Sequence, residues 1–178
     1  IVQVLGGLGL PESRAHATYI LRRMVAQIGS KLHFLNLPGI LDNRESRQVV
    51  LSESYVKDIY SLFKKLDIVF LGLGAPTPDS VLMRDGMILS AEELEMLLEK
   101  GVVGDICLRF LDKDGNFVPT EIDKRVIGIS LAELKEIKHV VGLAGGPEKV
   151  NIIRAALRGR YINHLITDHL TGKKILSD

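Results

Sequence analysis

The sequence predicts an α/β fold built on a mostly parallel sheet with helices on both faces. Helical patterns and apolar strand patterns alternate along the chain, and glycine-rich turns lead from strands into helices. The run at 67–73 is short, unbroken and rich in β-forming residues. Such a run is typical of a central parallel strand that is covered on both faces.

The first third of the chain has the order strand, glycine turn, helix. We expect a strand over 1–5, then the turn Gly6-Gly7-Leu8-Gly9, and then a helix with Pro11 in its first turn. Apolar residues at spacings of three and four lie on one face of this helix, and Gly29 ends it. A strand over 31–35 and a helix over about 53–65 follow.

The rest of the chain repeats the alternation. Capping boxes predict helices that begin after Ser90 and after Ser130. Between these helices we expect a strand over 102–111, a turn over 112–115 and a short strand around Phe117, which together make a hairpin. Further elements are predicted as strands over 140–144 and 162–167, with a helix from Pro147 to about Leu157. No repeat or linker interrupts residues 1–178, which predicts a single domain.

Composition excludes several classes of protein. Of the residues, 46% are hydrophobic and 25% are charged, and a net charge of +1 with interspersed signs indicates no nucleic-acid patch. No apolar stretch reaches the roughly 18 residues of a transmembrane helix, and the start lacks a signal-peptide pattern. The single cysteine, Cys107, suits a reducing compartment. We expect a cytoplasmic protein that makes no membrane contact.

Three glycine turns are candidates for a ligand site. In open parallel sheets, ligands bind beyond the carboxyl ends of the strands, where glycines permit close approach and helix N-termini favour anions. The turns are Gly6-Gly7-Leu8-Gly9, Gly72-Leu73-Gly74 and Gly145-Gly146-Pro147-Glu148-Lys149. Lys149 adds a positive charge, so the third turn predicts a phosphate contact. Glycine can equally stand in such turns for steric reasons alone.

Asp105 and Arg109 are charged residues in an otherwise apolar predicted strand. At a spacing of four they would share one face of that strand. There the carboxylate could accept hydrogen bonds from sugar hydroxyls, and the guanidinium could bind a phosphate. A structural ion pair or a solvated face is the alternative. Arg84 is a further phosphate-binding candidate on a loop.

No metal site and no catalytic set is predicted. The five histidines lack the spacing of metal ligands, and Cys107 lies in an apolar segment where cysteine is usually an inert packing residue. No serine stands in a nucleophile-elbow pattern.

Taken together, the motifs resemble the sugar-binding domain of the SorC family of bacterial transcription regulators. The resemblance covers nearly the whole chain and rests on six collinear motifs: Gly6-Gly7-Leu8-Gly9, residues 67–74 with Pro78-Asp79-Ser80 and Arg84, residues 103–110, residues 125–131, residues 144–149, and Ile166-Thr167-Asp168.

The resemblance implies a Rossmann-like fold related to ribose-phosphate isomerases, glucosamine-phosphate deaminases and CoA transferases. It also implies that a phosphorylated sugar binds as an effector. Binding of the effector changes the assembly of a homodimer or homotetramer and thereby its affinity for operator DNA. Gly6, Gly7 and Leu8 match the effector loop, Asp105 matches an acidic residue for sugar hydroxyls, and Lys149 matches a phosphate-binding lysine. Arg84 falls near a phosphate-binding arginine. The family's N-terminal helix-turn-helix domain and the early part of the sugar-binding domain are expected to lie outside this chain.

Two enzyme classes are alternatives to a sensor. A sugar-phosphate isomerase or deaminase of the same fold would need a general base, for which Asp105 is the only candidate. A dinucleotide-dependent enzyme is disfavoured because the third glycine of the fingerprint is missing and Asn36 stands where an acidic residue is needed. We therefore predict a protein that is not an enzyme and needs no cofactor.

Overall fold

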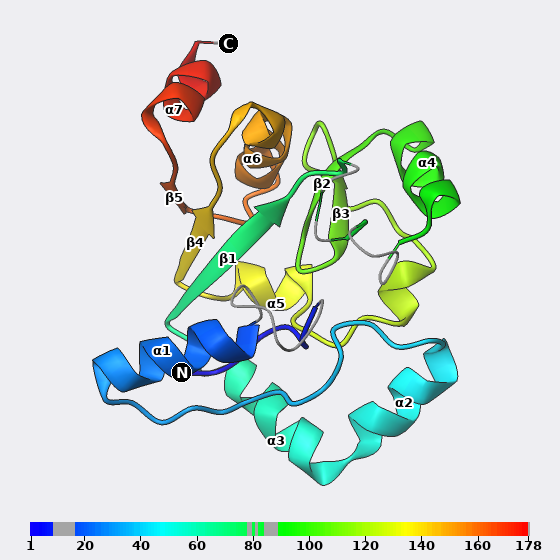
Figure 1. Cartoon of the computed structure of the whole chain (residues 1–178), viewed down its shortest axis with the longest axis vertical. Coiled ribbons are helices and arrows are strands. Elements are labelled where there is room, and N and C mark those ends of the chain that lie inside the picture. The colour runs from blue at the N-terminus through cyan, green and yellow to red at the C-terminus, as the bar shows by residue number, and fades with distance from the viewer. Residues whose placement is uncertain (9–16, 78–79, 81, 84–88, 178) are drawn as a thin grey trace. The chain divides into compact units, whose positions relative to one another are not determined.

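The computed structural model describes residues 1–8, 17–77, 80, 82–83 and 89–177. They form two compact units, which are described separately. The first unit comprises Ile1–Lys65 and Glu121–Ile129, and the second comprises Leu66–Thr120 and Ser130–Asp178. Figure 1 labels the helices and strands of both units. The single effector-binding domain over residues 1–178 stays a prediction.

The first unit contains the helices α1 (Ala17–Ile28), α2 (Arg44–Ser52) and α3 (Ser54–Phe63). Helix α1 confirms the first predicted helix from Ala17 onward, although it buries no residue, and Gly29 follows it with a φ of +68°. The predicted first turn with Pro11 lies outside the described residues. Helix α3 confirms the second and buries Val56, Ile59 and Phe63. Helix α2 was not predicted, because its sequence is polar and buries no residue.

The predicted strands over 1–5 and 31–35 are wrong in extent. Val2 forms a single bridge with His33, and Leu5 forms one with Gly128. The first segment thus pairs with His33 near its start and with the 121–129 segment near its end, and each pairing is an isolated bridge and not a continuous ladder. Apolar burial around these bridges nevertheless gives the first unit a core, because Leu35, Val126, Ile127 and Ile129 are fully buried.

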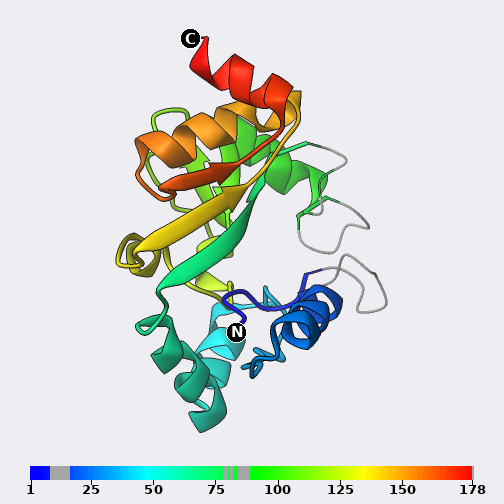
Figure 2. The same ribbon diagram turned by 90° about the vertical axis from the view of Figure 1, so that its left-hand side faces the viewer.

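A five-stranded sheet organises the second unit. Its strands are β1 (Ile68–Gly74), β2 (Val102–Ile106), β3 (Arg109–Asp112), β4 (His139–Leu143) and β5 (His164–Ile166), in the order β3-β2-β1-β4-β5. Strands β1, β4 and β5 are parallel and lie side by side (Figure 2), whereas β2 runs antiparallel to β1 and β3. This sheet confirms the α/β fold class.

In the described part of the second unit, four α-helices accompany the sheet: α4 (Ala91–Glu99), α5 (Leu131–Lys135), α6 (Val150–Arg158) and α7 (His169–Leu176). Both predicted capping boxes are confirmed, with Ser90 and Ser130 as the N-caps of α4 and α5. Helix α6 packs against β1, β2 and β3 and buries Ile152 and Ile153 completely. Among the described residues, no helix is long and apolar enough to cross a lipid bilayer.

Strand β1 departs from the prediction in its burial. Val69, Leu71 and Leu73 are buried, whereas Ile68 and Phe70 are about half exposed. Burial on both faces was therefore the wrong expectation for this strand, although its central place in the sheet is confirmed.

Candidate functional site

The parallel strands β1, β4 and β5 end at one edge of the second unit's sheet. Gly74 ends β1, the loop 144–149 follows β4, and Thr167 and Asp168 follow β5. Asp105 of β2 pairs with Gly74, so it lies at the same edge. We call these residues the carboxyl edge, which is where open α/β sheets bind ligands.

Residues 102–111 form a hairpin and not the predicted single strand. Cys107 and Leu108 join β2 to β3 with φ angles of +51° and +62°, the left-handed values that a two-residue hairpin turn requires. No glycine marks this turn in the sequence. In the pairing of the two strands, Asp105 lies opposite Phe110, and Arg109 lies opposite Ile106, the neighbour of Asp105. Because side chains alternate along a strand, the two lie on opposite faces, and the expectation of a shared face is wrong.

The Asp105 carboxylate is buried, with 7% of the residue exposed. Its Oδ2 accepts a hydrogen bond from the Leu108 N–H at 2.9 Å. Glycine at position 74 leaves room for the other oxygen, since a Cβ there would lie 1.8 Å from Oδ1. Burial raises the pKa of Asp105 to about 6, against the opposing effects of the Leu108 hydrogen bond and the positive charge of Lys149.

Lys149 ends a short 3-10 turn, Pro147–Lys149, directly before α6. Its side chain is half-buried, and its charge is near enough to lower the pKa of Asp105. The sequence predicted complementary roles for these two residues, and their contact with an effector stays a prediction. A buried carboxylate with an ammonium group in its vicinity offers an acceptor for hydroxyls and a charge for a phosphate.

Gly145 and Gly146 connect β4 to this turn. Gly146 has a φ of +106° and a ψ of 155°, a conformation restricted to glycine. Its N–H donates to Asp168 Oδ2 at 3.0 Å and to Thr171 Oγ1 at 2.8 Å. That N–H is thus engaged by the protein itself, and effector contact by either glycine stays a prediction.

Gly6, Gly7 and Leu8 belong to the first unit. The N–H groups of Gly6 and Gly7 donate to the carbonyls of Ile127 and Leu37, at 2.9 and 2.8 Å. A Cβ on residue 6 would lie 2.5 Å from a backbone carbonyl oxygen, so this close approach requires glycine. Their role in effector binding stays a prediction. Arg84 lies outside the described residues.

Sequence reasoning gave no role to four polar side chains of the second unit, although three of them, Ser80, Thr167 and Asp168, stand in the motifs of the resemblance. Asp168 and Thr171 hold Gly146, and the spacing of an N-cap residue followed by threonine three positions later could have indicated them. The hydroxyl oxygens of Ser80 and Thr167 are buried without a hydrogen-bond partner among the described residues. Buried hydroxyls without partners are uncommon in proteins, and because Thr167 directly follows β5 its hydroxyl favours a ligand at this edge.

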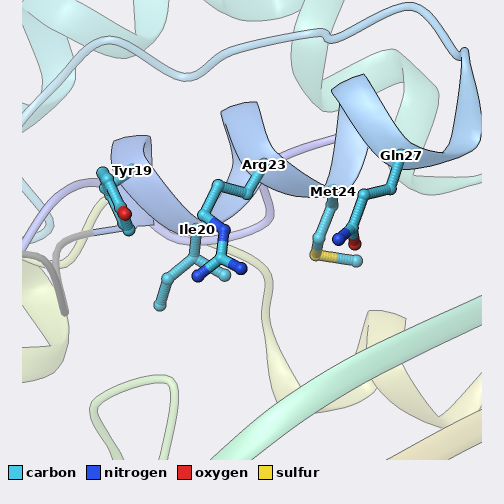
Figure 3. Close-up of a pocket in the computed structure, with 5 residues that line it drawn as sticks. All are labelled: Tyr19, Ile20, Arg23, Met24 and Gln27. Carbon is cyan, nitrogen blue, oxygen red and sulfur yellow. The ribbon is translucent and has the colours of Figure 1, made fainter.

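A pocket of about 200 Å³ lies elsewhere, on helix α1 of the first unit. Figure 3 shows its lining residues, all from that one helix: Tyr19, Ile20, Arg23, Met24 and Gln27. None of the predicted site residues is among them. In the part of the chain that the structure describes, no three His, Cys, Asp or Glu side chains are grouped to hold a metal ion.

The raised pKa of Asp105 leads to a prediction about stability and pH. Because the folded value of about 6 exceeds the ordinary 3.8, this carboxyl contributes stability that is present below about pH 4 and is lost as the pH rises through 6. Between pH 4 and 7 we expect the wild type to lose about 2 kcal/mol of unfolding free energy relative to Asp105→Asn, measured by urea denaturation. Asparagine still accepts the Leu108 N–H. Parallel pH profiles for the two proteins would contradict this assignment.

Comparison with known proteins gives consistent matches over the whole chain. A family model described as "Putative sugar-binding domain" matches residues 1–177. The sorbitol operon regulator of Klebsiella pneumoniae is 33% identical over 180 residues, which cover 98% of this chain and 56% of that protein. The deoxyribonucleoside regulator of Bacillus subtilis is 30% identical over 178 residues, which cover 100% of this chain and 56% of that protein.

The fold agrees with these matches. The crystal structure of the full-length sorbitol operon regulator SorC from Klebsiella pneumoniae superposes with a TM-score of 0.89 at 33% identity, over 99% of this chain and 56% of that one. This chain thus spans about half the length of the curated relatives that it matches. The chain belongs to the family of sugar-binding domains found in SorC-type transcription regulators.

Proposed function

We propose that this domain senses a phosphorylated sugar, which it binds at the carboxyl edge of the β1, β4 and β5 sheet. The observation that carries the proposal is the buried Asp105 carboxylate at this edge, close enough to Lys149 for its charge to lower the pKa of the carboxyl. The ammonium binds the phosphate, and the carboxylate accepts hydrogen bonds from sugar hydroxyls. Because its pKa is about 6, Asp105 is mostly ionised near pH 7 and can act as an acceptor.

Other residues are proposed as effector contacts from the family resemblance alone. They are the loop of Gly6, Gly7 and Leu8, which belongs to the first unit, and Arg84, which lies outside the described residues. The Thr167 hydroxyl, buried without a partner among the described residues, is a candidate donor to the ligand.

Effector binding acts on transcription through assembly. The bound sugar phosphate favours one arrangement of a homodimer or homotetramer over another, which is a coupling free energy between ligand and assembly. Operator DNA is bound by a helix-turn-helix domain outside these 178 residues, and the protein works in the cytoplasm. The relatives support this, since those that match are named as regulators of a sorbitol operon and of deoxyribonucleosides.

A sensor is favoured over a sugar-phosphate isomerase or deaminase of the same fold. Such an enzyme needs both a general base and a group that polarises a carbonyl. Asp105 has the pKa of a possible base, but its Oδ2 already accepts the Leu108 N–H and it lies beside a lysine suited to phosphate. The named relatives, all regulators, also favour sensing.

A thermal-shift panel tests the proposal. It contains phosphates of pentoses, deoxyribose, hexoses and hexitols, their unphosphorylated parents, and nicotinamide dinucleotides. A ligand at a hundredfold excess over its Kd stabilises the folded state by about 2.7 kcal/mol. At about 2–4 °C per kcal/mol, we expect at least one sugar phosphate to raise Tm by roughly 5–10 °C.

The outcomes separate the alternatives. A rise that requires the phosphate, with no turnover of the compound in a product assay, supports the sensor. Turnover would make the protein an enzyme. Stabilisation by neutral sugars equal to that by their phosphates would contradict a phosphate-binding site.

A further inference from the structure

One carboxylate links the loop after β4 to the start of helix α7. Asp168 Oδ1 accepts the N–H groups of Leu170 and Thr171, at 3.0 and 2.9 Å, as an N-cap does. Its Oδ2 has other partners, the Gly146 N–H at 3.0 Å and the Thr171 hydroxyl at 2.5 Å. These hydrogen bonds lower the pKa of Asp168 to about 2. Capping needs only the first oxygen, so the second requires a separate explanation.

Asp168 Oδ2, the second oxygen, accepts a hydrogen bond from Gly146, the residue that directly precedes the turn Pro147–Lys149. The carbonyl of Gly146 accepts the Lys149 N–H at 3.1 Å, and this bond closes the 3-10 turn. Thr171, which is 3% exposed, also accepts the Gly146 N–H through its Oγ1. Gly146 therefore stands between two sets of contacts. Its N–H donates to two oxygens at the start of α7, and its carbonyl accepts a hydrogen bond from the Lys149 N–H.

The glycine loop has little freedom around this contact. A Cβ on Gly145 would lie 2.6 Å from Asp168 Oδ2, so the carboxylate packs directly against the loop. Gly146 occupies a backbone region that is accessible only to glycine and must be stabilised by its surroundings. The hydrogen bonds from its N–H supply that stabilisation.

We propose that Asp168, with Thr171, is a positioning residue that fixes the Gly146 turn and so sets the position of Lys149 relative to Asp105. Asp168 does not itself contact the effector in this proposal. The same contact connects the turn of Lys149, the proposed phosphate-binding residue, to the first turn of α7. The inference rests on the proposed function only for its ligand-binding consequence, since the positioning itself is a property of the free protein.

The variant Asp168→Ser separates positioning from capping. Serine is as good an N-cap as aspartate, but its single oxygen cannot also reach the Gly146 N–H. Thr171→Val removes the second contact at nearly constant volume and provides an independent variant. Asp114→Ser is the matched control, because it removes the same charge from the turn near Gly115, which packs against the far end of α6 at Gly159.

The first readout needs no ligand. Lys149 lowers the pKa of Asp105, so a displaced Lys149 lets that pKa rise. In a 13C NMR titration we expect the pKa of Asp105 to rise in Lys149→Ala and, in the same direction, in Asp168→Ser and Thr171→Val. Asp114→Ser should leave it unchanged. A rise in Lys149→Ala alone, or no rise in any variant, overturns the inference.

The second readout is ligand binding. For a sugar phosphate that stabilises the wild type, we expect Asp168→Ser to weaken binding about tenfold, the effect of one hydrogen bond that places a charged group. The unphosphorylated parent should change less, whereas a general loss of structure would weaken both equally. If no sugar phosphate binds the wild type, the proposed function fails, and the pKa comparison still decides the role of Asp168.

Discussion

Replacing Lys149 by alanine is expected to weaken the binding of phosphorylated sugars by about 10- to 100-fold, because one charge-assisted hydrogen bond is lost. The neutral parent sugars should lose less than about twofold, since their hydroxyls contact Asp105 and not the ammonium. Isothermal titration calorimetry with one phosphate and its parent sugar measures both values.

The control for this variant is Lys138→Ala. Lys138 is exposed and directly precedes β4, at the opposite edge of the sheet from Lys149. It carries the same charge, so a general electrostatic attraction for phosphate would be weakened equally by both substitutions. Equal losses in the two variants, or equal losses for phosphate and parent in Lys149→Ala, would contradict a phosphate site at Lys149.

The largest effect on stability is expected from Gly104→Ala. A Cβ at this position would lie 2.3 Å from the Gly74 carbonyl oxygen and 2.5 Å from Ile152 Cβ. Neither neighbour can yield easily, because the first is backbone of the central strand and the second is fully buried in α6. We expect a loss of about 3 kcal/mol in the free energy of unfolding, measured in urea.

Gly72→Ala is the matched substitution on the adjacent strand. Nothing lies within 4 Å of a Cβ there. Since alanine restricts the unfolded chain more than glycine does, this variant should be unchanged or stabilised by about 0.5 kcal/mol. If Gly104→Ala were as stable as Gly72→Ala, close packing of α6 on the hairpin would not be a requirement. That packing matters for the site, because Asp105 follows Gly104 and Lys149 directly precedes α6.

Much of the fold could be predicted because its signals are local. The helices that begin after Ser90 and Ser130 were found from capping boxes, whose hydrogen bonds join residues three positions apart. Strand β1 was found from a continuous apolar run. Helices α2 and α7 were missed because neither shows a regular apolar stripe, and α2 buries none of its residues while α7 buries only Thr171.

The errors in the site have a physical cause of a different kind. The turn at Cys107 and Leu108 contains no glycine or asparagine, so the chain shows no local preference for reversing there. The Asp105 carboxylate accepts the Leu108 N–H and so supports the turn, and buried neighbours on both strands of the hairpin add to it. Only the folded sheet supplies these contacts, which is why Arg109 was placed on the wrong face.

The sequence by itself determined the α/β class, the order of most elements, and the choice of Asp105 and Lys149 as candidate ligand residues, because periodicity, caps and glycine turns act within a few residues. Only the tertiary structure decided that Gly74 makes room for Asp105, that Lys149 comes near enough to influence that carboxylate, and that Asp168 holds Gly146 across 22 positions of the chain. Such contacts depend on strand register and helix packing, which bring distant residues together only when the whole sheet has formed.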